Sequence, residues 1–74
     1  MHQYTLLLRA FLTEQIKARR KALHLTQEAM AEVLGVTAQA ISKWENNVTT
    51  PDIELLPKLA IYFGVKIDEL FLIS

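Results

Sequence analysis

The chain has 74 residues, 51% of them hydrophobic, with no cysteine and with eight basic against eight acidic residues. This length allows one domain, and the lack of cysteine excludes a disulfide framework and thiolate metal ligands, which fits a reducing cytoplasm. The zero net charge counts against non-specific nucleic-acid binding, which generally shows a basic excess. No apolar run approaches the about 20 residues of a membrane span.

Residues 1–12 form an apolar N-terminal extension. Its large apolar residues are Tyr4, Leu6, Leu7, Leu8 and Phe11. Leu8, Leu12 and Ile16 share one helical stripe, so the first helix, predicted over residues 13–23, can begin as early as Thr5. The run YTLLL also has β-propensity, which allows an extended arm that pairs across a dimer, although we favour the helical interpretation. In both cases the extension completes the core or covers a partner subunit.

Four further helices are predicted, over residues 27–34, 38–46, 53–63 and 67–72. Thr26 and Thr37 stand where a hydroxyl group caps the start of a helix. Gly35 and Gly64 stand where a left-handed residue ends one.

Pro51 is expected to interrupt the regular structure, and the fourth helix is expected to start after it with Asp52 as its N-terminal cap. Apolar residues recur at helical spacing along the chain, as in Met30, Val33 and Leu34. No segment alternates between apolar and polar residues for long enough to predict a sheet. The predicted fold class is therefore all-α, with five helices.

The stretch from Leu25 to Asn46 carries the clearest functional signal. It reads as two short amphipathic helices joined by a turn, and the second has the right length to enter a DNA major groove. Ile41 and Trp44 are spaced to anchor this second helix in the core. Its opposite face presents Ala38, Gln39, Ser42, Lys43 and Asn46 to solvent or DNA.

The side chains on that face match the chemistry of DNA. Gln39 can bond an adenine edge in two places, and Lys43 can reach O6 and N7 of guanine. Thr37 and Ser42 can bond either bases or phosphates. The part of the chain up to Asn47 carries a net charge of +2 and the remainder −2, so the positive side coincides with the motif.

From Ile16 to Phe71 the chain resembles the Cro/repressor-type helix-turn-helix family of transcription regulators, also called the xenobiotic response element family. The resemblance rests on the successive runs IKARRKALHLTQ, AMAEVLGV, TAQAISKWENN and PDIELLPKLAIYFGVKIDEL. It implies a five-helix lambda-repressor-like DNA-binding domain over residues 13–74, in which the second and third helices form the helix-turn-helix.

The resemblance also implies roles for individual residues. Gln27, at the start of the second helix, would present its side chain and backbone N–H to a phosphate. Asn46 and the loop Asn47–Thr50 would hold the next stretch of DNA backbone. Arg20 and Glu45 match a family pair that forms a buried ion pair between the first helix and the end of the third.

The chain departs from the family pattern at three positions. Ala38 stands where relatives often place a long polar base reader, although its methyl group can touch a thymine methyl. Asn47 replaces the usual glycine after the WEN triplet, and asparagine tolerates a left-handed turn at modest cost. Lys66 replaces the usual Ser or Thr cap before the fifth helix. These departures affect sequence preference and affinity more than fold.

We therefore predict a sequence-specific transcription regulator, most often a repressor in this family, that binds double-stranded DNA. It is expected to act in the cytoplasm as a homodimer on an inverted repeat. We expect no cofactor, no metal site and no membrane association.

The alternative is a protein-interaction module on the same fold, such as an antitoxin or a regulatory partner. The zero net charge, Ala38 and the apolar N-terminus favour that alternative. An enzyme ranks third, because no nucleophile–base pair or metal set can be assembled from these residues. The sequence fits both a complete minimal regulator and a DNA-binding domain of a longer protein.

Overall fold

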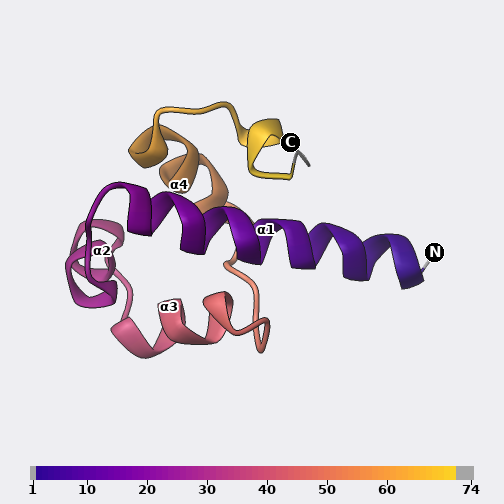
Figure 1. The fold of residues 1–74 in the computed structure, drawn as a ribbon, viewed down its shortest axis with the longest axis horizontal. Helices are drawn as coiled ribbons and strands as arrows, with labels where there is room; N and C mark the ends of the chain where they lie inside the picture. Colours follow the sequence, from indigo (N-terminus) through magenta and orange to yellow (C-terminus); the bar gives the residue numbers. More distant parts are fainter. Residues whose placement is uncertain (1, 72–74) are drawn as a thin grey trace.

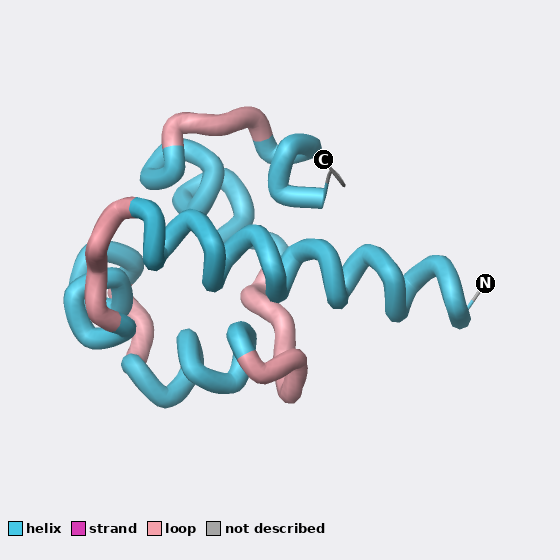
Figure 2. Tube along the Cα trace, viewed as in Figure 1, coloured by secondary structure: helices cyan, strands magenta, loops and turns pink. Residues whose placement is uncertain are grey.

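The structure is a computed structural model that describes the backbone of residues 2–71 and the side chains of residues 7–71. Its α-helices are α1 (His2–Ala22), α2 (Gln27–Leu34), α3 (Ala38–Glu45) and α4 (Leu56–Phe63), with two 3-10 helices, η1 (Ile53–Leu55) and η2 (Ile67–Phe71) (Figure 1). No strand occurs in this part of the chain, so the fold is all-helical, as predicted (Figure 2). The described residues contain four α-helices, whereas the sequence predicted five.

Helix α1 is much longer than the predicted helix over residues 13–23, since it begins at His2. Residues 2–12 are therefore helical and not extended. The first proline of the chain is Pro51, so no residue of α1 lacks the N–H group that the helical hydrogen bonds require. The N-terminal half of α1 projects beyond the other helices (Figure 1), whereas Leu12 and Ile16 lie in the core.

The turn between α2 and α3 is closed by the residues that the sequence singled out. Thr26 Oγ1 accepts a hydrogen bond from Ala29 N at 3.0 Å, and Thr37 Oγ1 accepts one from Ala40 N at 3.1 Å. Gly35 is left-handed, with φ of 72°, as glycine permits without a side-chain clash. Both predicted caps and the predicted glycine turn are confirmed.

The predicted fourth helix over residues 53–63 is wrong in its first turn. The chain forms η1 there, and α4 starts only at Leu56. An α-helix from Ile53 would need an N–H group at residue 57 to bond the Ile53 carbonyl, and Pro57 has none. The Leu56 N–H bonds that carbonyl instead, which makes a 3-10 turn. Asp52 occupies the cap position, but its side chain makes no capping hydrogen bond.

The predicted fifth α-helix over residues 67–72 is the 3-10 helix η2, and Leu72 lies outside the described residues. Lys66 offers no side-chain acceptor for the first N–H groups of this segment. The carboxylate of Glu69 reaches back instead and accepts a hydrogen bond from Lys66 N at 2.8 Å. The cap thus comes from within the helix and not from the residue before it.

The core lies where α1 packs against α3 and η2, and where α2 meets α3. Its buried apolar side chains are Leu12, Ile16, Met30, Ala31, Leu34, Ile41, Trp44, Leu59, Ala60 and Leu70. Burying one large aliphatic side chain stabilises a fold by about 1.5–3 kcal/mol. Val33 shares the helical spacing of Met30 and Leu34 but is 59% exposed, so it does not join them in the core.

Candidate nucleic-acid interface

Helix α3 has one buried face and one exposed face. Ile41 and Trp44 are buried and anchor the helix. Gln39, Lys43 and Asn46 are exposed and lie four and three residues apart, so they form one stripe along the opposite face. The structure thus brings three of the predicted DNA-binding residues together on one accessible surface.

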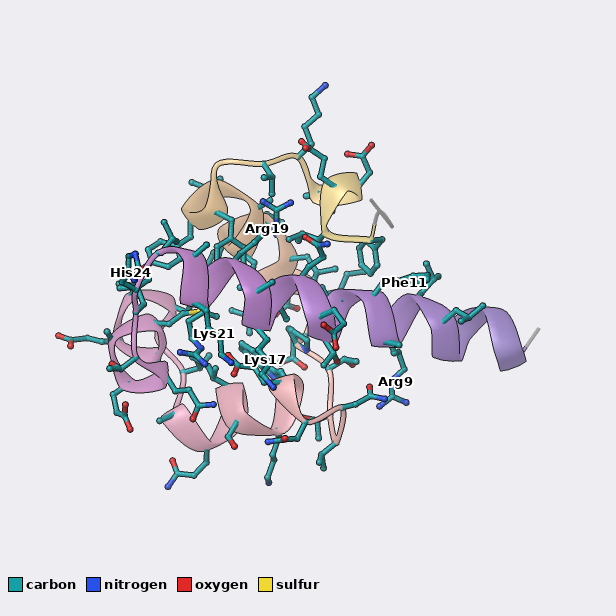
Figure 3. All side chains as sticks on the ribbon, viewed as in Figure 1. Arg9, Phe11, Lys17, Arg19, Lys21 and His24 are labelled. Carbon is teal, nitrogen blue, oxygen red and sulfur yellow. The ribbon has the colours of Figure 1, made fainter. Side chains whose placement is uncertain are left out.

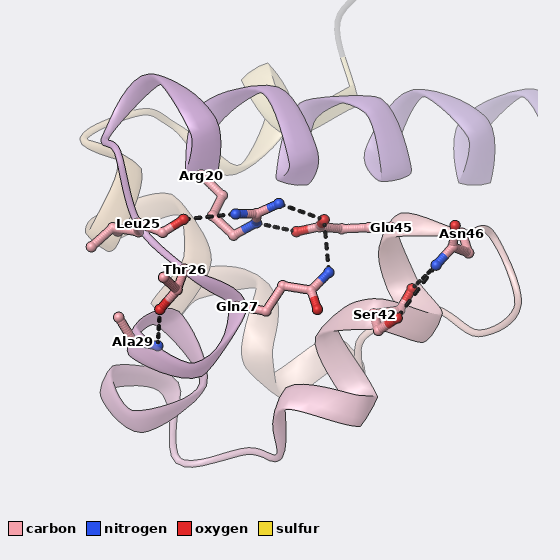
Figure 4. A network of polar contacts seen from close by, with 8 residues as sticks. All are labelled: Arg20, Leu25, Thr26, Gln27, Ala29, Ser42, Glu45 and Asn46. Atoms are coloured by element: carbon pink, nitrogen blue, oxygen red, sulfur yellow. Dashed lines mark hydrogen bonds and ion pairs between the residues drawn. The ribbon is translucent and has the colours of Figure 1, made fainter.

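Three other predicted contact residues, Thr37, Ala38 and Ser42, are less accessible or already hydrogen-bonded. Ala38 is half-buried and packs against the core, so little of its methyl group faces outward. Ser42 is half-buried, and its carbonyl accepts a hydrogen bond from Asn46 Nδ2 at 2.8 Å (Figure 4). The Thr37 oxygen is an N-terminal cap, although its hydroxyl proton can still be donated.

The guanidinium of Arg20 and the carboxylate of Glu45 form a two-pronged ion pair (Figure 4). Arg20 Nε and Nη2 donate to the two Glu45 oxygens at 2.6 and 3.0 Å. Arg20 Nη1 also donates to the carbonyl of Leu25 at 2.6 Å. Glu45 is only 7% exposed, so this pair joins α1, the α1–α2 connection and the last residue of α3 in a site with little water.

Burial raises the pKa of Glu45, but hydrogen bonds from Arg20 and Gln27, together with the charges of Arg20 and Lys17, outweigh it. The net pKa of Glu45 therefore lies below the ordinary value of a glutamate. The hydrogen bond to Glu45 in turn raises the pKa of Arg20. Both groups are charged at neutral pH, which keeps the link between α1 and α3 intact.

Gln27 takes part in this network. Its Nε2 donates to Glu45 Oε1 at 3.2 Å, and the residue is half-buried (Figure 4). The resemblance placed this side chain on a DNA phosphate, whereas the structure places its amide nitrogen on Glu45. Gln27 thus connects the start of α2 to the end of α3.

The segment after α3 is exposed from Asn46 to Thr50. Asn47 adopts the left-handed conformation with φ of 58°, as expected from its place in the family pattern. Lys43 O accepts hydrogen bonds from Val48 N at 2.8 Å and Thr49 N at 3.4 Å, which hold the segment close to the end of α3. The polar groups of this loop therefore continue the exposed stripe of α3.

Sequence reasoning missed Thr13, which fixes this loop from α1. Thr13 is buried, and its Oγ1 donates to Trp44 O at 2.9 Å and lies 3.5 Å from Asn47 Oδ1. Thr13 precedes Arg20 by seven residues, so the two lie on one face of α1. The seven-residue spacing from Arg20 was the signal in the sequence that could have placed Thr13 near the end of α3.

The rest of the described chain offers no alternative chemistry of this strength. It contains no group of three or more His, Asp or Glu side chains that could hold a metal ion. Among the same residues, no helix combines the length and apolar character that a membrane crossing requires.

Comparisons with known proteins agree with this geometry. An uncharacterized HTH-type transcriptional regulator of Methanocaldococcus jannaschii is 45% identical over 53 residues, which are 70% of this chain and 80% of that protein. The HTH-type transcriptional activator BcrR of Enterococcus faecalis is 44% identical over 57 residues, 77% of this chain. The match spans only 28% of the length of BcrR.

Among solved structures, the P22 c2 repressor protein, in complex with synthetic operator 9T in the presence of Tl+, superposes with a TM-score of 0.75 at 38% identity. The match covers 81% of this chain and 91% of that one. Hydroxypropylphosphonic acid epoxidase from S. wedmorenis superposes with a TM-score of 0.73 at 27% identity, over 84% of this chain but only 33% of the epoxidase.

A model of the helix-turn-helix family (HTH_3) matches residues 16–70, which include α2, α3, α4 and nearly all of η2. The match therefore covers the buried ion pair and the exposed stripe of α3 as one continuous unit. The chain belongs to the Cro/repressor-type helix-turn-helix family of transcriptional regulators.

Proposed function

We propose that this protein binds operator DNA sequence-specifically, with α3 in the major groove, and represses transcription. The observation that carries the proposal is the exposed stripe of Gln39, Lys43 and Asn46 on a helix whose other face is anchored in the core. In this domain, η2 takes the place of the fifth helix of a lambda-repressor-like fold. The P22 c2 repressor, which is similar over most of its resolved length, was solved on an operator.

In this arrangement, Gln39 and Lys43 read bases in the major groove. Gln39 pairs with the N6 and N7 edge of adenine, and Lys43 with O6 and N7 of guanine. Each such contact discriminates against the wrong base by about 1–3 kcal/mol. Ala38, half-buried, touches a thymine methyl group at most. Direct readout therefore depends chiefly on two side chains.

Phosphate contacts hold the helix in register. Thr37 supplies a hydroxyl group at the start of α3, and Ser42 supplies one in the middle of the helix. Asn46 and Asn47 supply amide groups where α3 ends, and both residues are exposed. Gln27 contributes its backbone N–H at the start of α2 and the second Nε2 hydrogen, which its bond to Glu45 leaves available.

We further propose that the protein acts as a homodimer in the cytoplasm. Two-fold symmetric operators place half-sites about 34 Å apart, which one copy of this domain cannot span with a single recognition helix. The projecting half of α1 leaves Leu7 52% exposed, which supports an apolar contact with a second copy. This contact is tested by light scattering, which measures the molar mass of the wild-type protein and of Leu7→Gln in solution.

The decisive test is selection of bound duplexes from a random double-stranded library, run in parallel with Lys43→Ala. We expect an inverted repeat to be enriched, and the preference at one position of each half-site to be lost in the variant. A folded protein that enriches no sequence at low salt would contradict sequence-specific binding.

A second candidate function, recognition of a protein partner, is favoured by one surface. Val33, Leu34, Lys58, Ile61 and Tyr62 line a shallow, mostly apolar groove between α2 and α4. Val33 and Ile61 are 59% and 80% exposed. The salt dependence of binding distinguishes the two functions. The affinity for DNA falls steeply with salt, because binding to phosphates releases counterions, whereas the affinity of a partner for an apolar groove changes little.

A further inference from the structure

Arg9 lies on the side of α1 that faces the end of α3. It precedes Thr13 by four residues and Arg20 by eleven, so the three share one helical face. Arg20 pairs with Glu45, and Thr13 contacts Trp44 and Asn47. Along α1 toward its N-terminus, Arg20 thus contacts the end of α3 and Thr13 contacts the start of the following loop. Arg9 lies one further helical turn, about 5.4 Å, beyond Thr13.

The guanidinium of Arg9 has no partner in the part of the chain that the structure describes. Its Nε is buried without a hydrogen bond, and no carboxylate there forms an ion pair with it. The neighbouring loop from Asn46 to Pro51 contains no acidic residue. Arg9 is half-buried, so its charge is partly removed from water without compensation by an acid.

Figure 3 shows Arg9 and Lys17 on the side of α1 facing α3 and its loop, while Arg19 lies on the side facing α4. Arg19 is already engaged, since its Nε donates to Gln15 Oε1 at 2.8 Å. Arg9 and Arg19 therefore differ in the surface they face and in whether a side chain satisfies Nε.

We propose that Arg9 binds a DNA backbone phosphate beside the loop Asn46–Thr50. The assignment rests on the proposed function, which brings DNA to α3 and this loop. A phosphate at the loop supplies the anion that Arg9 lacks, and guanidinium groups bind phosphate oxygens in a two-pronged geometry. Arg9 precedes the family match, which starts at residue 16, so the N-terminal extension adds a DNA contact to the domain.

The test compares Arg9→Gln with Arg19→Gln, which removes the same charge from the side of the same helix that faces α4. Affinity for a mixed-sequence duplex is measured over a range of salt concentrations. Each phosphate contact contributes about 0.9 to the slope of log affinity against log salt. We expect Arg9→Gln to make this negative slope less steep by about 0.9 per bound protomer. Arg19→Gln and Arg9→Lys should leave the slope near wild type.

An unchanged slope in folded Arg9→Gln overturns the assignment while leaving DNA binding through α3 intact. Absence of DNA binding by the wild-type protein overturns both the assignment and the proposed function. If Arg9→Gln does not fold, the side-chain Nε–H resonance of Arg9 in the wild-type protein decides. Its shift on addition of the duplex, with the Arg19 signal unmoved, supports the contact, and an unmoved Arg9 signal contradicts it.

Discussion

The two halves of α1 belong to one continuous helix but differ in what holds them. The C-terminal half buries Leu12 and Ile16 and is bonded through Thr13 and Arg20 to the end of α3. The N-terminal half projects past the other helices, with Leu7 52% exposed. Short isolated helices are marginal in water, so the first half depends on continuity with the second.

This difference separates stability from recognition along a single helix. The residues of α1 that hold the fold together are Leu12, Thr13, Ile16 and Arg20, and mutations of these four are expected to destabilise the domain. Leu7 is 52% exposed and Arg9 Nε has no hydrogen-bond partner among the described residues, so changes at these two positions are expected to alter binding of a second copy or of DNA more than the stability of the monomer. Four predictions test this division, from the largest effect to the smallest.

The largest effect is expected for Glu45→Ala, which removes the partner of Arg20. A buried ion pair that loses one member leaves an uncompensated charge, so the free energy of unfolding should fall by about 3–5 kcal/mol. Urea denaturation followed by circular dichroism measures this loss. Glu32→Ala, at an exposed position of α2, is the control and should stay within about 0.5 kcal/mol of wild type. Equal stabilities of the two variants would show that the ion pair does not anchor α3.

The next effect compares the two halves of α1 directly. Ile16→Ala empties a fully buried position and should cost about 2–5 kcal/mol. Leu7→Ala, on the projecting half, should change the stability of the monomer by no more than about 0.5 kcal/mol. Both are read from denaturation midpoints at protein concentrations low enough to keep the chain monomeric. A large loss in Leu7→Ala would mean that the projecting half is part of the core.

The third prediction concerns acid. The pKa of Glu45 is lower in the folded protein than in the unfolded chain, so its ionisation contributes stability above the unfolded pKa. That contribution is lost as the pH falls through the folded pKa. Melting temperatures of wild type and Glu45→Gln, measured from neutral to acidic pH, should therefore converge on acidification. A constant difference would show that Glu45 is not charged in the fold.

The smallest effect is expected at the end of the anchored half. His24 follows α1 with φ of 58°, a left-handed conformation that costs a residue with a side chain about 1–2 kcal/mol. His24→Gly removes this strain but adds freedom to the unfolded chain, so a net gain of about 0.5–1 kcal/mol is expected. Thermal denaturation measures the gain, and a loss of stability would indicate that the imidazole makes a contact worth more than the strain.

The fold was predictable wherever a local signal decides the structure. Thr26, Gly35 and Thr37 set the ends of α2 and α3, because caps and left-handed turns depend on single residues and their neighbours. The predicted α-helix over residues 53–55 is a 3-10 turn, because Pro57 has no N–H group to bond the Ile53 carbonyl. That error was avoidable from the sequence.

Other features depend on tertiary packing and left no such signal. Val33 has the spacing of a core residue, but the elements that the structure describes leave it 59% exposed. Gln27 stands at the start of α2, and only the packed structure brings Glu45 within hydrogen-bond reach of it. The pair of Arg20 and Glu45 came from the family resemblance, since twenty-five residues separate them in the sequence.

The network around Glu45 has a kinetic consequence. Arg20 and Gln27 hold the last residue of α3 before any DNA arrives, so the recognition helix does not have to become ordered on binding. A pre-organised surface loses little conformational entropy when it docks. Operator variants should therefore be approached at similar association rates and differ mainly in how long the complex survives, which dissociation kinetics on matched and mismatched duplexes would reveal.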